Sequence, residues 1–127
     1  MLPFSIDLKP GLPVAEQILF AVKRAVATGQ LSPGDPFPSV RVLSQELRIN
    51  PNTAHKVIAA LVTQSILITT PAIGSLVADR SPSGSRERAE LLGAELERVV
   101  VEAKNLGLTI DDVQAGLVTQ WKRLTRK

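Results

Sequence analysis

The sequence has no cysteine and no tyrosine, and among its 127 residues there are one histidine, one tryptophan and three phenylalanines. Without cysteine the chain forms neither disulfides nor thiolate metal sites, which is compatible with a reducing compartment. Because aromatic side chains are so few, the core must be mostly aliphatic. Apolar residues make up 44% of the chain, so it can build such a core and its composition does not predict disorder.

The usual signals of several protein classes are missing. No apolar run approaches the ~20 residues of a membrane span, and residues 1–4 lack the basic and apolar regions of a signal peptide. We therefore expect a cytoplasmic protein. There is no glycine-rich phosphate loop, and the single histidine, His55, has no second metal ligand nearby in sequence. The pair Asp111–Asp112 is better explained by helix capping than by catalysis. We predict no enzyme activity, no metal and no cofactor.

The net charge of +3 and the pI of about 9.7 permit a nucleic-acid partner without requiring one. Residues 1–80 hold seven basic and five acidic residues, and residues 81–127 hold eight and seven. Neither part is a basic block. A DNA-binding surface must therefore come from the placement of charges rather than from their number.

The most informative stretch covers residues 47–62. Asn50 is a strong N-cap residue, and Pro51 suits the first helical position. The apolar residues that follow recur at helical spacing and form one face: Ala54, Val57, Ile58, Leu61 and Val62. The other face begins with Asn52, His55 and Lys56. A helix with a buried back and a short polar front suits insertion into a DNA major groove, although an ordinary amphipathic surface helix has the same pattern.

The neighbouring segments predict the other elements of a winged helix-turn-helix. Residues 14–28 form a helix that Gly29 ends, residues 32–35 form a type II turn, and Ser39 caps a helix over residues 40–47. Strands are expected over residues 66–70 and 75–78, with the turn at 71–74. Residues 1–13 form an extended arm, in which the alternation of Phe4, Ile6 and Leu8 allows a short edge strand.

Residues 79–85 have the composition of a linker, and residues 86–127 contain two amphipathic helices separated near Gly107. Thr109 and Asp112 predict a capping box at the start of the second helix. Two such helices cannot bury their apolar faces against each other alone, so they need a partner surface. We expect this surface to be a dimer interface, and packing on the N-terminal domain is the alternative. The residues predicted to form it are Leu92, Leu96, Val99, Val100, Val113, Leu117, Trp121 and Leu124.

Five segments in order resemble the N-terminal domain of the GntR family of bacterial transcription regulators: residues 12–18, 29–35, 38–41, 49–53 and 74–77. The Asn50–Pro51–Asn52–Thr53 turn and the short C-terminal region are most similar to the YtrA subfamily. The resemblance implies a dimeric DNA-binding regulator, often a repressor. It places DNA contacts at Arg41, Asn50, Asn52, Thr53 and either His55 or Lys56, and wing residues at Thr70, Ile73, Gly74 and Ser75.

Three positions depart from the family pattern. The wing has no basic residue, so the minor-groove and phosphate contacts that the family makes there are not expected from its charge. Arg48 replaces the usual glycine before Ile49, where it either strains the backbone or adds a phosphate contact, and it joins the predicted DNA-binding residues. Ser65 replaces the glycine that usually follows the recognition helix.

These observations predict a mostly α fold with a small β-hairpin: a winged helix-turn-helix over residues 1–78, a linker over 79–85 and a two-helix dimerisation region over 86–127. The predicted function is sequence-specific regulation of transcription, by a homodimer that binds a near-palindromic operator, most often as a repressor. The alternative is a winged-helix module that binds another protein and binds DNA weakly. The sequence does not identify a small-molecule effector or the operator sequence. The C-terminal region is too short for a dedicated ligand pocket.

Overall fold

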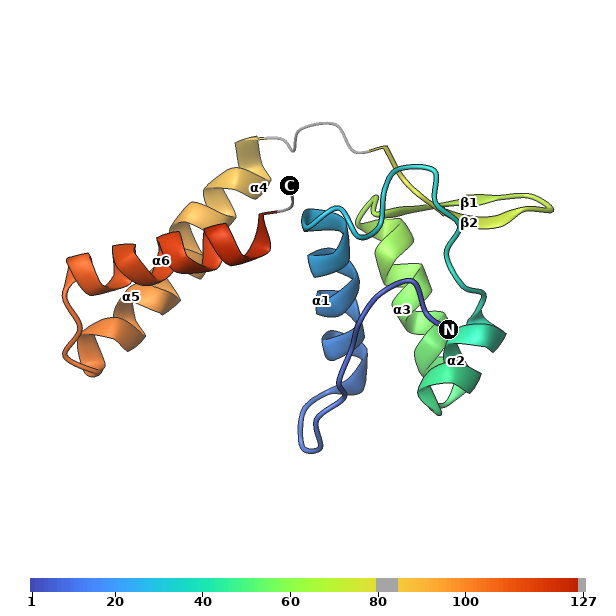
Figure 1. Ribbon diagram of the computed structural model, residues 1–127, viewed down its shortest axis with the longest axis horizontal. Helices are drawn as coiled ribbons and strands as arrows, with labels where there is room; N and C mark the ends of the chain where they lie inside the picture. Colours follow the sequence, from blue (N-terminus) through green and yellow to red (C-terminus); the bar gives the residue numbers. More distant parts are fainter. Residues whose placement is uncertain (80–84, 126–127) are drawn as a thin grey trace. The chain divides into compact units, whose positions relative to one another are not determined.

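In the computed structural model, residues 1–79 and 85–125 are described, and they fall into two compact units, one on each side of this gap. The first unit contains three helices, α1 (Val14–Ala27), α2 (Val40–Leu47) and α3 (Pro51–Thr63), and the strands β1 (Leu67–Thr70) and β2 (Gly74–Val77) (Figure 1). The second contains α4 (Ser85–Glu90), the π-helical turn η1 (Leu91–Glu95), α5 (Leu96–Asn105) and α6 (Ile110–Leu124). The predicted fold class is confirmed.

The helices of the first unit begin where the sequence predicts. The Ser39 hydroxyl accepts a hydrogen bond from the amide of Val42 at 3.2 Å, which caps α2. The side-chain oxygen of Asn50 accepts from the amide of Asn52 at 2.8 Å, and Pro51 is the first residue of α3. Each cap satisfies an amide that has no partner within its helix. Gly29, with φ of 80°, follows the end of α1.

The two strands pair antiparallel with Leu67 opposite Val77 and Thr70 opposite Gly74. Residues 35–37, for which the sequence predicts no strand, pair with the other edge of β2. The amide of Val77 donates to the carbonyl of Asp35 at 2.8 Å, and the amide of Phe37 donates to that of Ser75 at 2.9 Å. The hairpin is therefore bonded to the body of the unit along β2.

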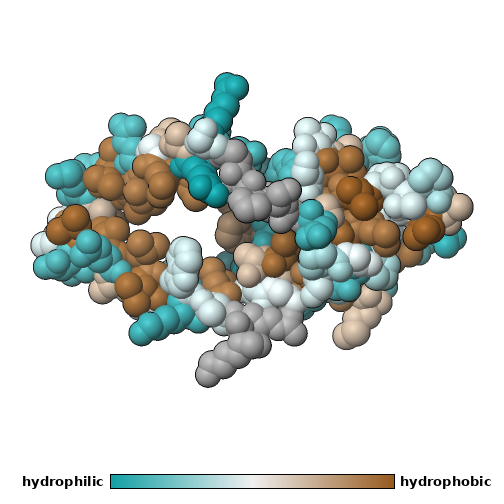
Figure 2. Space-filling model, turned by 90° about the horizontal axis from the view of Figure 1, so that it is seen from above, coloured by the Kyte–Doolittle hydropathy of each residue, from teal (hydrophilic) through white to brown (hydrophobic). Residues whose placement is uncertain are grey.

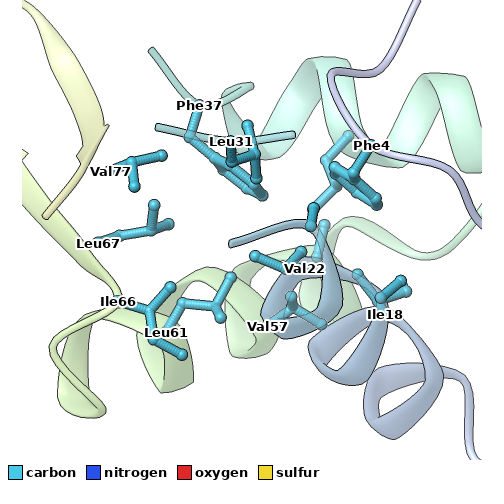
Figure 3. Packing of buried hydrophobic residues seen from close by; sticks show 14 residues of the cluster. Phe4, Ile18, Val22, Leu31, Phe37, Val57, Leu61, Ile66, Leu67 and Val77 are labelled. Atoms are coloured by element: carbon cyan, nitrogen blue, oxygen red, sulfur yellow. The ribbon is translucent and has the colours of Figure 1, made fainter. Parts of the chain in front are cut away.

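One aliphatic cluster, to which every element of the first unit contributes, forms its core (Figure 3). Its fully buried large side chains are Ile18, Val22, Leu31, Leu43, Val57, Leu61, Ile66, Leu67 and Val77. The rings of Phe4 and Phe37 stack within it, with centroids 5.8 Å apart. On α1 the buried residues are Ile18, Ala21, Val22 and Ala25, whereas Val14 at the start of the helix is 36% exposed.

The edge strand considered for residues 4–8 does not form. Phe4 is buried, while Ile6 and Leu8 pack against the core from the side. The arm is fixed by a side chain rather than by a strand: the amide of Lys9 donates to Gln17 Oε1 at 2.8 Å, and Gln17 Nε2 donates back to the Lys9 carbonyl at 3.0 Å. The alternating pattern therefore reflects partial burial along an irregular segment.

In the second unit, α4, η1 and α5 follow one another as a continuous helical run, which the sequence predicts as one α-helix without the π-helical turn. Gly107, with φ of 75°, lies in the turn that follows. The predicted capping box at the start of α6 is confirmed. The Thr109 amide donates to the Asp112 carboxylate at 2.8 Å, and the Asp112 amide donates to the Thr109 hydroxyl at 3.1 Å. Of the predicted linker, residues 80–84 lie outside the described residues, and Ser85 begins α4.

Candidate nucleic-acid interface

The turn between α2 and α3 is set by a left-handed residue. Arg48, with φ of 55° and ψ of 48°, follows the last residue of α2. Its amide and that of Ile49 both donate to the carbonyl of Ser44, the latter at 3.0 Å. Ile49 then packs against the core, and α3 begins two residues later. This reversal joins the two helices as a helix-turn-helix.

Helix α3 is divided as its sequence predicts. Ala54, Val57 and Leu61 are completely buried, so the helix turns its other side outward. The residues at the start of that outer side are Asn52, His55 and Lys56, which are exposed, and Thr53, which is half-buried. In the described part of the chain their side chains form no hydrogen bond and no ion pair. The front of α3 is thus a short polar surface whose groups can bind an external partner.

Two further predicted residues lie beside this front. Arg41 is exposed in the first turn of α2, and that turn contains no acidic residue. A cation at a helix N-terminus gains nothing from the macrodipole, so its position is not explained by α2 itself. Asn50 is different: its side-chain oxygen accepts the cap hydrogen bond, and its NH₂ group is free to donate to DNA.

The wing is the β1–β2 hairpin. Its turn is closed by the amide of Ile73, which donates to the carbonyl of Thr70 at 3.2 Å, and Ala72 has φ of 68° between them. Ile73 is 68% exposed. Gly74 is exposed as well, whereas Thr70 and Ser75 are half-buried. Residues 66–78 contain no charged side chain, so the wing presents an apolar tip.

The predicted dimerisation residues lie on a largely exposed apolar surface of the second unit. Leu92, Leu96, Val99, Val100, Leu117 and Trp121 are exposed, and Val113 and Leu124 are half-buried. A groove of about 650 Å³ runs between α5 and α6 and is lined by several of them. Figure 2 shows apolar side chains gathered over these helices. Exposed apolar surface of this kind is typical of interaction sites.

Four further exposed apolar residues of this unit are not among the predicted dimerisation residues. Leu91, Leu106, Ile110 and Val118 are exposed as well. A regular 3.6-residue period places Leu91 beside the predicted stripe rather than on it. The π-helical turn over residues 91–95, with hydrogen bonds between residues five apart, interrupts this period.

The three helices, the helix-turn-helix and the hairpin define the first unit as a winged helix-turn-helix domain, the architecture of a DNA-binding regulator. Residues 14–77 match the family described as bacterial regulatory proteins, gntR family. The chain belongs to the GntR family.

Relatives of similar length support this assignment. The chain is 30% identical to the uncharacterized HTH-type transcriptional regulator YhcF of Bacillus subtilis (strain 168), over 85% of this chain and 86% of that protein. It is 27% identical to the HTH-type transcriptional repressor YtrA of the same organism, over 84% and 82%. The crystal structure of a transcriptional antiterminator from Listeria monocytogenes EGD-e matches with a TM-score of 0.81 and 28% identity, over 94% of this chain and 89% of that one.

Membership of the family makes the chain a DNA-binding transcriptional regulator rather than an enzyme. Its similarity to YtrA agrees with the subfamily that the recognition turn predicts. Within residues 1–79 and 85–125, no helix has the length and apolar character needed to cross a membrane. The same residues contain no cluster of acidic, histidine or cysteine side chains that could hold a metal ion.

Proposed function

We propose that this regulator is a cytoplasmic repressor that binds a near-palindromic operator as a homodimer. The observation that carries the proposal is the polar front of α3, whose side chains have no partner within the described residues. The name of the relative YtrA, a transcriptional repressor, supports the sign of regulation. Binding to DNA supports the cytoplasmic location.

The chemistry of the front suggests a division of labour. An asparagine amide matches the paired donor and acceptor of an adenine edge, so Asn52 would read a base. Lys56 and the Thr53 hydroxyl suit phosphate oxygens, which fix the register of the helix without reading sequence. Arg41 can bind either a phosphate or a guanine edge in bidentate fashion. Each good base contact discriminates by about 1–3 kcal/mol.

The apolar surface of the second unit supports the dimer. Among residues 85–125 Ala103 is buried, and large apolar side chains around it stand in solvent. A second copy of the same surface would cover them, as in a two-fold interface. Two-fold symmetry then places two copies of α3 on two half-sites about 34 Å apart, one turn of DNA, which accounts for the near-palindromic operator.

The proposed function is tested by fluorescence anisotropy, with DNA from upstream of the protein's own gene and with a scrambled duplex, at two salt concentrations. We expect selective binding that weakens with salt, because bound phosphates release counterions. Because the dimer would lose one base contact in each half-site, Asn52→Ala should lose about 30-fold or more in affinity for the operator, up to roughly 20,000-fold, and much less for the scrambled duplex. Lys23→Ala, which removes a charge from the exposed face of α1, is the control and should lose little.

Equally weak binding to both duplexes would contradict the proposal. It would favour the alternative, a module that binds another protein, for which the uncharged wing is the supporting observation.

The dimer is tested by sedimentation velocity on the full chain. Leu117→Glu places a charge in the apolar groove and should yield a monomer that binds the operator poorly. Thr119→Glu adds the same charge to an exposed position nearly opposite on α6 and should remain dimeric. A Leu117→Glu variant that stays dimeric would show that the interface lies elsewhere.

A further inference from the structure

We propose that Arg48 is a phosphate-binding residue, kept at a position where its backbone conformation favours glycine. This inference rests on the proposed function. Arg48 has φ of 55° and ψ of 48°, the left-handed region in which the Cβ of an L-residue is crowded. A glycine adopts this conformation without that cost, which is why helices so often end with one.

The backbone at this position has no freedom to relax. The amides of Arg48 and Ile49 both donate to the Ser44 carbonyl, and Ile49 packs against the core directly afterwards. A different φ at residue 48 would break these hydrogen bonds and displace α3. The strain is therefore built into the turn and is carried by whichever residue stands there.

Nothing within the fold selects an arginine. The side chain is exposed, and among residues 1–79 and 85–125 it has no hydrogen-bond partner and no ion pair. A cation gains at the C-terminal end of α2 but loses at the N-terminal end of α3, which begins three residues further on, so the macrodipoles do not favour it. Within residues 40–63 the acidic residue is Glu46, and its carboxylate forms an ion pair with the amino group of Met1, with 3.0 Å between Oε1 and the nitrogen.

The charge of Arg48 is complementary to a polyanion at the front of α3. Arg48 lies in the turn that leads to the cap of α3, and Arg41 and Lys56 are also exposed on these two helices without partners among the described residues. A DNA phosphate beside this turn would give the guanidinium the partner that the fold does not supply. Glycine would stabilise the turn better, and arginine binds DNA better.

The test compares the melting temperature and the DNA affinity of Arg48→Gly in the full chain. We expect the melting temperature to rise by a few degrees while operator binding weakens. Because each protomer of the dimer would bind one phosphate fewer, the slope of log affinity against log salt should fall by about 1.8. Between about 50 and 200 mM salt, the deficit in affinity relative to the wild type should change by a factor of roughly twelve and be larger at low salt.

Ser65→Gly is the matched control. Ser65 has φ of 61° just after α3, and its amide and that of Ile66 donate to the carbonyls of Val62 and Leu61 in a similar helix-ending turn. This variant should also melt at a higher temperature but should bind the operator with the wild-type slope. Arg48→Ala removes the charge and keeps the strain, so it should show the reduced slope without the gain in melting temperature.

An Arg48→Gly variant with wild-type affinity and slope would overturn the phosphate contact. A lower slope without a higher melting temperature would overturn the claim that the position is strained. If the wild-type chain itself shows no selective, salt-dependent binding, the proposed function fails as well, and that result is read from the wild type alone.

Discussion

Replacing Ile73 by arginine places a cation at the tip of a wing that has no charge of its own. Ile73 is 68% exposed and closes the turn through its backbone amide, so the new side chain can extend into solvent without disturbing the core or the hairpin. Pro71 is left in place because its fixed φ suits the turn. If the wing lies beside DNA, the guanidinium will meet a phosphate or the minor groove.

The size of the effect follows from the number of phosphates. One new contact in each protomer adds two contacts to a dimer, and the slope of log affinity against log salt should steepen by about 1.8. Lowering the salt from about 200 to 50 mM should then favour the variant over the wild type by a further factor of about twelve. Arginine at both positions 71 and 73 should double the change in slope.

The measurement is a salt titration of operator binding by anisotropy. Ile73→Gln is the control, because it replaces the apolar side chain with a polar one and adds no charge, and its slope should equal that of the wild type. An Ile73→Arg variant with unchanged affinity and slope would show that the wing does not reach DNA. In that case α2, α3 and the turn between them would carry all of the binding.

Three further predictions concern stability. Asn50→Ala removes the cap of α3 and should cost about 0.5–2 kcal/mol in urea unfolding, and an unchanged midpoint would contradict the role of the cap. Leu61→Ala opens a cavity in the core and should cost about 2–5 kcal/mol by the same measurement, whereas a smaller loss would mean that the site collapses. Hydrogen bonds from the backbone amide and then the side chain of Thr109 lower the pKa of Asp112. The ionised Asp112 carboxylate therefore stabilises the folded protein fully above the ordinary pKa of 3.8, and this stabilisation is lost as the pH falls through the lower pKa of the folded state. In this acidic range, circular dichroism should show loss of α6 helicity in the wild type. The Asp112→Asn variant should show no such pH-dependent loss.

The starts of helices and the positions of turns were predicted well where a residue has a single physical role in its local segment. Asn50 followed by Pro51 places the N-cap and the first residue of a helix at these two positions. Thr109 and Asp112, three residues apart, form the capping box that this spacing predicts. Gly34 has φ of 88° in the turn at 32–35, which its sequence predicts as type II. In each case the determining interaction lies within three residues, so the sequence alone contains it.

Features that depend on distant partners were not predictable in this way. The pairing of Asp35 and Phe37 with β2 joins segments some forty residues apart, and no local pattern indicates it. Phe4 alternates with polar residues as a strand would, yet it is buried by stacking on Phe37. The π-helical turn at residues 91–95 changes the helical period itself, which a search for a fixed period overlooks.

For the candidate site, sequence indicates which residues stand at the front of α3, because caps and periodicity fix the helix and its faces. The sequence does not determine the conformational free energy that each residue costs at its position. The sequence leaves backbone strain and a phosphate contact as alternatives at Arg48, and its left-handed conformation is established by the structure, in which Ser44 accepts hydrogen bonds from two amides. The identity of the bases that Asn52 would read depends on the DNA partner and not on this chain.

The distribution of aromatic residues has a practical consequence. Trp121 is the only tryptophan, the chain has no tyrosine, and the indole is 73% exposed on the proposed dimerisation surface. Light absorbed at the red edge of the protein's ultraviolet band is therefore emitted by this single side chain, and burial of its ring by a second copy would shift the emission to shorter wavelength. The aromatic residues of the DNA-binding domain are all phenylalanines, which do not absorb light of this wavelength, so the domain does not fluoresce under this excitation. Intrinsic fluorescence will thus follow assembly without a label, and unfolding of the winged helix will need another probe.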